Sequence, residues 1–200
     1  MFTIATATRP EMGPVLETGM FRLRARTFST RLGWDVKTTE DGLEIDEFDS
    51  CPTVTYITAT QPEQGVVACW RLLPTLGPNM LRDTFPELLH GQPAPAAADT
   101  WELSRFAVDT ERVRAEGNES SAATAEFGRL TVEVMAESVR FARQRRIARY
   151  VTVTTTAIER LLKRQGVNIY RLGAPLRIGK VMTVASFIEI DDQTSHALGL

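Results

Sequence analysis

Acidic residues are concentrated in one short stretch of the chain, EDGLEIDEFD at positions 40–49. Glu44 and Asp46 stand two residues apart, so on a strand their side chains would project from the same face. Neighbouring carboxylates repel each other unless a cation or a shared proton compensates them. That cation could come from arginines that sit within apolar patterns: Arg24, Arg71 and Arg105.

The residues alone leave two interpretations of these charges open. One is an ion-pair network that fastens a helix to a sheet. The other is a ligand site in which carboxylates, including Glu102, hold an ammonium or sulfonium group and arginines hold a carboxylate. Phe28 and Trp34 follow Arg24 in the sequence. They could sandwich a flat ring, face a cation, or simply belong to the core.

Several common catalytic motifs are absent from the sequence. It has neither the G-x-x-x-x-G-K-[ST] phosphate loop nor a G-x-G-x-x-G after a strand, which argues against a nucleoside triphosphatase and a dinucleotide enzyme. A G-x-S-x-G nucleophile elbow is missing too. The histidines, His90 and His196, do not stand at metal-ligand spacing with Cys51 and Cys69, so no metal site is expected.

Composition narrows the class of protein further. The chain has 200 residues, 43% of them hydrophobic and 24% charged, as in an ordinary globular domain. Its net charge of −2 gives no reason to expect nucleic acid as a partner. No apolar run approaches the roughly 18 residues of a membrane span, and the N-terminus lacks the pattern of a secretory signal. Two cysteines cannot form a disulfide framework, which favours a reducing cytoplasm.

Apolar spacing of about 3.6 residues predicts three helices. The first, over about 10–32, is expected to be flexible because Gly13 and Gly19 interrupt it, and Gly33 is expected to end it. The other two are a long amphipathic helix and a short helix that Gly166 stops, over 121–147 and 157–165.

Period-two patterns predict strands between these helices. They cover 43–45, 53–60, 65–73, 101–108, 149–155 and 180–190. The remaining stretches are a long Pro/Gly-rich connection, a polar loop and a polar C-terminal tail that frays, at 74–100, 111–121 and 191–200. Helices and largely antiparallel strands in this order predict one α/β (α+β) layer domain over residues 1–200.

Five short fragments of the sequence follow one another at characteristic spacings. They are Arg24-x3-Phe28-x5-Trp34, Glu44-x-Asp46-x2-Asp49, Cys69-Trp70-Arg71-Leu72-Leu73-Pro74, Gly77-Pro78-x-Met80-Leu81 with Phe85-Pro86, and Trp101-Glu102-Leu103-Ser104-Arg105-Phe106. Together they resemble the LuxI-type acyl-homoserine-lactone synthases, or autoinducer synthases. The resemblance is strong from about residue 20 to 110 and continues more weakly, through 151–154, to about 190.

This resemblance implies a reaction and a fold. Family members transfer an acyl chain from a thioester of acyl carrier protein, or in some members coenzyme A, to the amine of S-adenosylmethionine. They then close the lactone and release methylthioadenosine, so the product is the quorum-sensing signal N-acyl-L-homoserine lactone. S-adenosylmethionine is a consumed substrate, and no cofactor is expected. The implied fold is a three-layer α/β/α sandwich around a mixed, largely antiparallel sheet, similar to the GNAT acyltransferases.

The resemblance also implies the residues of an S-adenosylmethionine pocket, matched position by position. They are Arg24, Phe28, Trp34, Asp46, Asp49, Arg71, Phe85 and Arg105. A general base must take the proton of the attacking amine, and Glu44 is the first choice and Glu102 the second. Backbone N–H groups between Ser104 and Phe106 are candidates for stabilising the oxyanion.

The acyl chain needs an apolar tunnel. Its expected lining is Leu103, Met135, Thr152, Ile158, Leu161 and Leu162, although each of these could equally be an ordinary core residue. Thr152 stands where the family often has a threonine associated with 3-oxo chains.

Arginines crowd the expected end of the long helix: Arg140, Arg143, Arg145, Arg146 and Arg149. They could form a solvated helix end, which is favourable near the negative end of the helix dipole. They could instead dock an acidic acyl carrier protein, which would make turnover sensitive to salt. Beyond the two substrates, no membrane, nucleic acid or stable protein partner is expected.

Two other functions stay open. One is a GNAT-like N-acyltransferase that acts on another amine, and the other is a catalytically silent protein that binds S-adenosylmethionine or an acyl group. Release of methylthioadenosine would separate the synthase from both. The acetyltransferase pyrophosphate loop, [RQ]-x-x-G-x-[GA], is absent, which argues against a plain acetyl-CoA enzyme.

Overall fold

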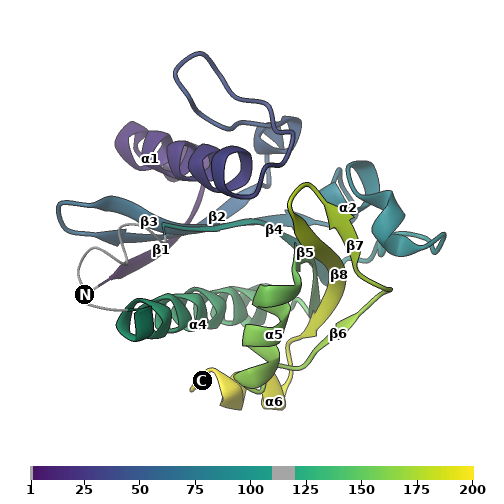
Figure 1. Cartoon of the computed structure of the whole chain (residues 1–200). Coiled ribbons are helices and arrows are strands. Elements are labelled where there is room, and N and C mark those ends of the chain that lie inside the picture. The colour runs from purple at the N-terminus through teal and green to yellow at the C-terminus, as the bar shows by residue number, and fades with distance from the viewer. Residues whose placement is uncertain (1, 110–119) are drawn as a thin grey trace.

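A single mixed sheet runs through the computed structural model, which describes residues 2–109 and 120–200, with the backbone alone for 120–127 (Figure 1). Its strands, in chain order, are β1 Thr3–Thr8, β2 Thr55–Gln61, β3 Gly65–Pro74, β4 Thr100–Val108, β5 Arg149–Thr155, β6 Ile169–Arg171, β7 Leu176–Ile178 and β8 Val181–Glu189. They are arranged as β1-β2-β3-β4-β5-β8-β6, and β7 also pairs with β8. Only β4 and β5 are parallel; the other pairs are antiparallel.

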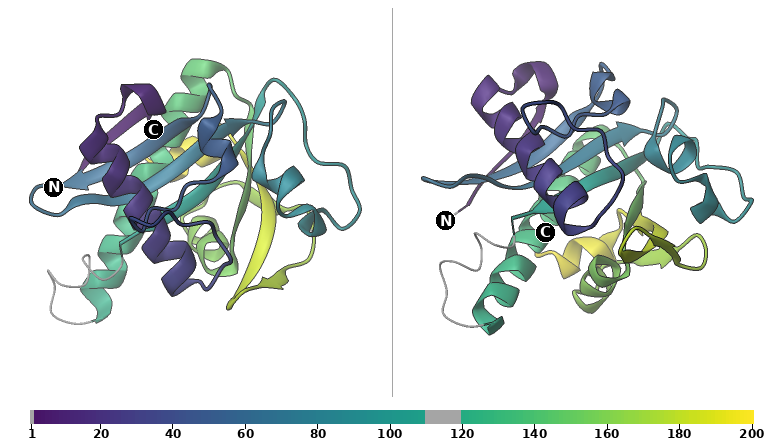
Figure 2. Two further views of the ribbon diagram at one scale, coloured as in Figure 1. Left: turned by 90° about the horizontal axis from the view of Figure 1, so that it is seen from above. Right: turned by 45° about the horizontal axis from the view of Figure 1, so that its top comes forward.

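Helices cover both faces of this sheet (Figures 1 and 2). They are α1 Pro14–Ala25, α2 Met80–Asp83, α4 Ser120–Arg145, α5 Thr156–Arg164 and α6 Asp192–Ala197. Helix α1 packs on β3 and β4, whereas α4 packs on the opposite face, against β1, β2 and β3. This arrangement confirms the predicted three-layer α/β/α sandwich with a mixed, largely antiparallel sheet.

Each helix layer has its own core. Between the sheet and α4, the fully buried residues Leu130, Val134 and Met135 recur at helical spacing and so form one stripe. On the other face, Met20, Phe21 and Leu23 of α1 pack against the sheet. Burial of these apolar side chains is the main force that holds the layers together.

Four sequence-based expectations need correction. Strands β1, β6 and β7 were not predicted, and the strand expected at 43–45 is only an isolated bridge between Thr38 and Glu44. The tail at 191–200, expected to fray, forms α6, because the Asp191 carboxylate accepts the Thr194 backbone N–H at 2.8 Å and caps the helix. The 74–100 connection contains α2 and a 3₁₀ turn, Pro86–Leu89. The polar loop expected at 111–121 falls, up to residue 119, outside the described residues.

The parallel strands β4 and β5 separate part-way along their length. They pair only from Thr100–Leu103 to Arg149–Thr152, although both strands continue. Beyond this point β4 carries a bulge against β3: Cys69 pairs with Ala107 and Arg71 with Ser104, so that both Arg105 and Phe106 lie opposite Trp70. The bulge bends β4 away from β5 and opens a gap between them.

Candidate active site

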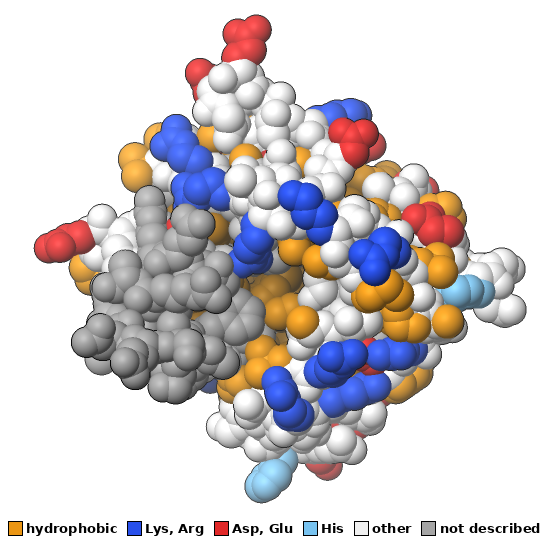
Figure 3. Space-filling view, in the orientation of Figure 1, with side chains coloured by type: hydrophobic (Ala, Val, Ile, Leu, Met, Phe, Trp, Pro, Cys, Tyr) orange, Lys and Arg blue, Asp and Glu red, His pale blue; other side chains and the backbone are white. Residues whose placement is uncertain are grey.

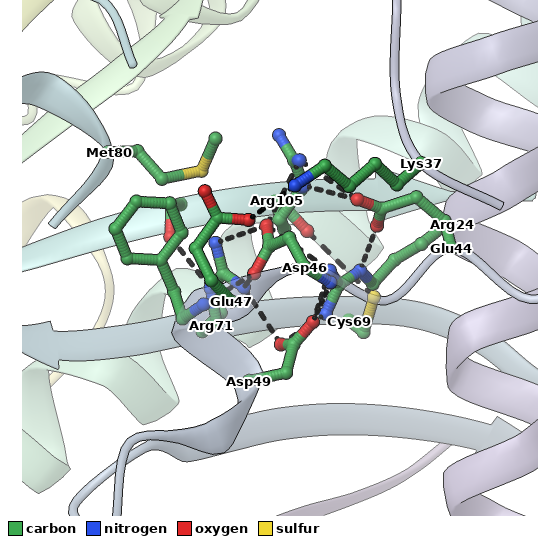
Figure 4. Close-up of polar contacts among 12 residues, drawn as sticks. Arg24, Lys37, Glu44, Asp46, Glu47, Asp49, Cys69, Arg71, Met80 and Arg105 are labelled. Carbon is green, nitrogen blue, oxygen red and sulfur yellow. Dashed lines mark hydrogen bonds and ion pairs between the residues drawn. The ribbon is translucent and has the colours of Figure 1, made fainter. Parts of the chain in front are cut away.

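Six of the charged residues singled out in the sequence meet in one buried cluster on the α1 side of the sheet, whereas Glu102 lies outside it (Figure 4). Its six members are Arg24 of α1, Arg71 of β3, Arg105 of β4 and the three carboxylates Glu44, Asp46 and Asp49. None of the six side chains is more than 9% exposed. We call this group the charged cluster.

Each guanidinium of the charged cluster binds two or more of its carboxylates. Arg24 forms a bidentate pair with Asp49 at 2.8 and 2.9 Å and donates through Nε to Glu44 at 2.5 Å. Arg71 binds Asp46 and, at 2.8 Å, Asp49. Arg105 donates through Nη2 to Glu44 at 2.8 Å and to Asp46 at 3.0 Å. The ion-pair network that the sequence left open therefore exists.

Burial and pairing shift the titration of these groups. Burial alone would raise the pKa of Asp49, but the guanidinium groups of Arg24 and Arg71 outweigh it and hold that pKa well below its usual range. Tyr56, which the sequence analysis did not single out, donates its hydroxyl to Asp49 at 2.7 Å. Burial, together with this carboxylate, raises the pKa of Tyr56. Burial also raises the pKa of Cys69 to about 12, so its thiol stays protonated and unreactive.

A cavity of about 550 Å³ lies beside the charged cluster and fills the gap between β4 and β5. Figure 3 shows a hollow with an apolar floor in this region. Its β4 wall is formed by Ser104, Arg105, Phe106 and Val108, and its β5 wall by Val153, Thr154 and Thr155. Among the described residues, Arg105 is the only member of the charged cluster that lines it.

Three aromatic side chains form one end of the cavity: Phe28, Trp34 and Phe85. A π-helical turn, Arg26–Arg31, brings the first two together, because the Leu32 N–H bonds to the Thr27 carbonyl and the Trp34 N–H to the Phe28 carbonyl. Their rings stack at 5.3 Å with only 13° between the planes. A flat ring held between them would need about 7 Å. The suggested sandwich is therefore not formed, whereas the Arg105 guanidinium lies 5.1 Å from the centre of the Phe28 ring.

Two of the six residues expected around the acyl chain, Ile158 and Leu161 of α5, line the cavity. The other four do not. Leu103, Met135 and Leu162 are fully buried in the core on the α4 side, and the Thr152 hydroxyl donates to the Leu103 carbonyl at 2.8 Å. The sequence analysis missed other lining residues: Arg31, Leu32, Met80, Arg164, Val181 and Met182. Of these residues, only Met80 belongs to one of the five family fragments, so the sequence held an indication for Met80 alone.

Neither candidate general base lies on the cavity wall. Both oxygens of Glu44 are taken up by guanidinium groups, one by Arg24 and the other by Arg105. Glu102 faces α2 instead, and its two oxygens accept the backbone N–H groups of Met80 at 3.0 Å and Leu81 at 2.7 Å. Burial raises the pKa of Glu102, although these two N–H groups act in the opposite direction.

The arginines at the end of α4 lie away from the cavity. Arg149 begins β5 and the cavity adjoins Val153–Thr155, so about 13 Å of strand separates Arg149 from the nearest part of the cavity wall. Arg140 pairs with Glu137, Arg143 donates to Ser195 and Arg149 pairs with Glu189, while Arg146 follows the helix with a positive φ of 58°. Docking of the acyl donor by these residues therefore stays a prediction.

Within residues 2–109 and 120–200, no group of three or more His, Cys, Asp or Glu side chains is placed to hold a metal ion. No helix in the described part of the chain has the length and apolar character to cross a membrane.

Comparison with known proteins decides the family. The profile described as "Autoinducer synthase" matches residues 13–198. An acyl-homoserine-lactone synthase of Pseudomonas aeruginosa is 40% identical over 191 residues, which cover 95% of this chain and 90% of the relative. This chain belongs to the autoinducer synthase family. It is accordingly an enzyme, an acyltransferase that synthesises an acyl-homoserine lactone.

Solved structures of autoinducer synthases agree with this assignment. The crystal structure of the synthase LasI is 38% identical and superposes with a TM-score of 0.86, covering 99% of this chain and 94% of that one. The coenzyme A-dependent synthase BjaI, solved with S-adenosylmethionine and isopentyl-CoA, is 26% identical with a TM-score of 0.78, covering 99% of this chain and 87% of that one. The fold and its likeness to acyltransferases are those that the sequence implied.

Proposed function

We propose that the cavity holds S-adenosylmethionine at its aromatic end and the acyl thioester along α5, with the reacting atoms at the β4 bulge. One observation carries the proposal. One and the same cavity is lined by three aromatic rings at one end, by the Arg105 guanidinium and by the apolar residues Ile158 and Leu161. An aromatic wall suits a flat ring or a sulfonium, the guanidinium suits a carboxylate, and an apolar wall suits an acyl chain.

The remaining charged cluster acts as the rigid support of this wall. Arg24 and Arg71 are fully engaged below the cavity, and both are fully buried. They hold Glu44 and Asp46, which in turn fix Arg105 at the cavity surface. Substrate-binding groups that are held in advance lose little entropy when the substrate arrives.

The amine of S-adenosylmethionine must lose a proton before it attacks the thioester carbonyl, and Glu102 is the better of the two bases for this step. The two oxygens of Glu44 are held by the charged guanidinium groups of Arg24 and Arg105, whereas those of Glu102 accept only from neutral backbone N–H groups. Glu102 has a raised pKa and lies two residues from Ser104 on the same face of β4, and Ser104 lines the cavity. Glu102 takes the proton through a water molecule.

The attack develops negative charge on the carbonyl oxygen. The β4 bulge at Arg105 and Phe106 interrupts the ladder with β3 beside the cavity, and a bulge leaves backbone groups without strand partners. Arg105 holds a φ of +57°, a strained conformation that persists only where the surroundings impose it. Backbone N–H groups of this bulge stabilise the oxyanion. The tetrahedral intermediate then collapses to the amide, the C–S bond of the thioester breaks, and the departing thiolate of the carrier takes up the proton that the base removed.

The second step closes the lactone. The carboxylate oxygen of the acylated S-adenosylmethionine attacks its own γ-carbon, and methylthioadenosine leaves with the electron pair of the broken C–S bond. This step is intramolecular, so a folded conformation of the methionine chain supplies much of the rate. The aromatic end of the cavity and Arg105 hold the chain in that conformation.

The acyl donor enters beside α5. Figure 3 shows Lys and Arg side chains gathered over this helix and around the hollow. Helix α5 exposes Arg160, Lys163 and Arg164, and Arg164 reaches the cavity wall. A basic rim suits the acidic surface of an acyl carrier protein and equally the phosphates of acyl-CoA. Because it adjoins the cavity, we propose this rim as the docking face in preference to the arginines of α4.

Mass spectrometry of the products tests the proposal. The purified chain is given S-adenosylmethionine with a panel of acyl-carrier and acyl-CoA thioesters, and an N-acyl-homoserine lactone should appear together with methylthioadenosine. The variant Glu102→Gln should lower kcat about 10²- to 10⁴-fold, as expected for loss of a general base. An acylated amine without methylthioadenosine would contradict the proposed reaction. Unchanged turnover of Glu102→Gln would contradict the choice of base.

A further inference from the structure

The tip of the β7–β8 hairpin makes an unusually close contact with the segment that carries Trp34. A Cβ atom at Gly179 would lie 2.8 Å from the Gly33 carbonyl oxygen and 3.0 Å from Cδ1 of the Trp34 ring. Real Cβ atoms do not approach other atoms so closely, so only glycine fits here. The Lys180 backbone N–H also donates to the Leu32 carbonyl at 3.3 Å.

The contact is reciprocal. Gly33 has a φ of +66°, and a Cβ atom there would lie 2.8 Å from Cε of Lys180. The Lys180 side chain therefore lies along the backbone of Gly33, while Gly179, with a φ of +57°, lies under Trp34. Two segments about 145 residues apart in the chain thus interlock through a pair of glycines.

The two partners of this contact differ in how they are supported. Strands β7 and β8 pair up to Ile178 and Val181, directly beside the hairpin tip. Residues 33–37, by contrast, belong to no helix or strand. The tip is thus braced by the sheet, and a displacement at the contact would move Trp34 rather than the hairpin.

We propose that Gly179 is a positioning residue that holds the Trp34 ring against Phe28 and Phe85 at the aromatic end of the cavity. The Trp34 ring is fixed on two other sides, by stacking on Phe28 at 5.3 Å and by a tilted contact with Phe85 at 5.9 Å. The hairpin tip supplies the remaining support. This inference rests on the proposed function, in which the aromatic end binds S-adenosylmethionine.

Steady-state kinetics of Gly179→Ala test the inference, with Gly65→Ala as the matched control. Gly65 has a similar positive φ of 74°, but a Cβ atom there meets nothing within 4 Å. Both variants place an alanine at a positive φ and so have similar backbone strain, but only Gly179→Ala displaces Trp34. We expect its KM for S-adenosylmethionine to rise about five- to tenfold, the worth of an aromatic contact. The KM for the acyl thioester and kcat should stay within about twofold of Gly65→Ala.

Two further variants keep the test decisive. Lys180→Ala removes the side chain that packs on Gly33 without straining the backbone, and it should raise the same KM by a smaller factor even if Gly179→Ala does not fold. In a Trp34→Leu background, Gly179→Ala should have no further effect on that KM, because the residue it acts through is gone.

The outcomes are distinguishable. Equal values of KM for S-adenosylmethionine in Gly179→Ala and Gly65→Ala would overturn the inference, as would an equal loss in every kinetic constant, which marks general loosening. A wild-type chain that forms no acyl-homoserine lactone would overturn the proposed function instead.

Discussion

The charged cluster and the cavity beside it are built on opposite principles. The charged cluster is closed: three guanidinium groups and three carboxylates satisfy one another, and none is more than 9% exposed. The cavity is open and lined mainly by apolar side chains that leave room for a ligand. Substitutions in the charged cluster should therefore destabilise the protein, whereas the lining of the cavity can change shape while the enzyme stays active.

This difference has a direct energetic meaning. A buried charge needs its partners, so each member of the cluster depends on the exact type and place of two others. A cavity-lining side chain such as Leu161 makes part of its contacts with the ligand instead of with the protein. Its contribution to function therefore depends mainly on the volume that it leaves for the ligand. Substitutions in the charged cluster should therefore lower the free energy of unfolding. Substitutions in the cavity lining should instead change which acyl-homoserine lactones are produced.

The largest effect is expected for Asp49→Asn. The substitution keeps the shape of the side chain but leaves Arg24 and Arg71 with one carboxylate fewer. Removing one partner of a buried ion pair costs about 3–5 kcal/mol, and we expect a loss of this size in the free energy of unfolding, measured by urea denaturation.

Glu47→Gln is the matched control for Asp49→Asn. Glu47 lies in the same 3₁₀ turn, Glu47–Ser50, but pairs with Lys37 at 3.5 Å, and the two side chains are 62% and 80% exposed. Such pairs contribute about 0–1 kcal/mol. If Asp49→Asn costs no more than Glu47→Gln, the contrast between a closed cluster and an exposed pair is lost.

The neighbours Leu161 and Leu162 give a sharper comparison within one helix. Leu162 is fully buried in the core, so Leu162→Ala should cost about 2–5 kcal/mol of unfolding free energy and leave the product spectrum unchanged. Leu161 lines the cavity, so Leu161→Ala should cost less stability. It should favour longer acyl chains over shorter ones about tenfold, because the cavity gains volume.

Urea denaturation and mass spectrometry of the lactones from a mixed set of acyl thioesters measure the two effects. The same change of product spectrum in both leucine variants would mean that the acyl chain does not lie along the cavity side of α5.

The charged cluster could be predicted from the sequence because its members are charged residues, several of them within apolar patterns where charge is unusual. Arginines and carboxylates within apolar patterns must find partners, and this requirement brought together the six residues even though the expected strand at 43–45 is mostly absent. The family fragments carry the same residues. The central strands were predicted from periodicity, and the three layers were implied by the family resemblance.

The cavity could not be anticipated in the same detail, because its lining depends on orientation. Leu161 and Leu162 are identical in type and adjacent in sequence, but they point about 100° apart on a helix. Which one faces the cavity follows from how α5 packs on β5 and β8. Thr152 and Thr154 share one face of β5 and differ in position instead: Thr152 is still paired with β4, and only Thr154, beyond the paired part, lines the cavity. Helix α6, however, could have been predicted, because an aspartate such as Asp191 is a common N-cap residue.

The smallest effect is expected where charges lie on the surface, and it distinguishes the two candidate docking faces. Arg160→Glu reverses an exposed charge of α5 beside the cavity, and Arg140→Glu makes the same change on α4. With an acyl carrier protein thioester at low salt, Arg160→Glu should lower kcat/KM about five- to tenfold, because a charge at the rim of an interface acts mainly on association. The loss should shrink as salt screens the charge. Arg140→Glu should have little effect, and a small acyl thioester should be used equally well by both variants. A greater loss in Arg140→Glu would return the docking face to the end of α4, where the sequence first suggested it.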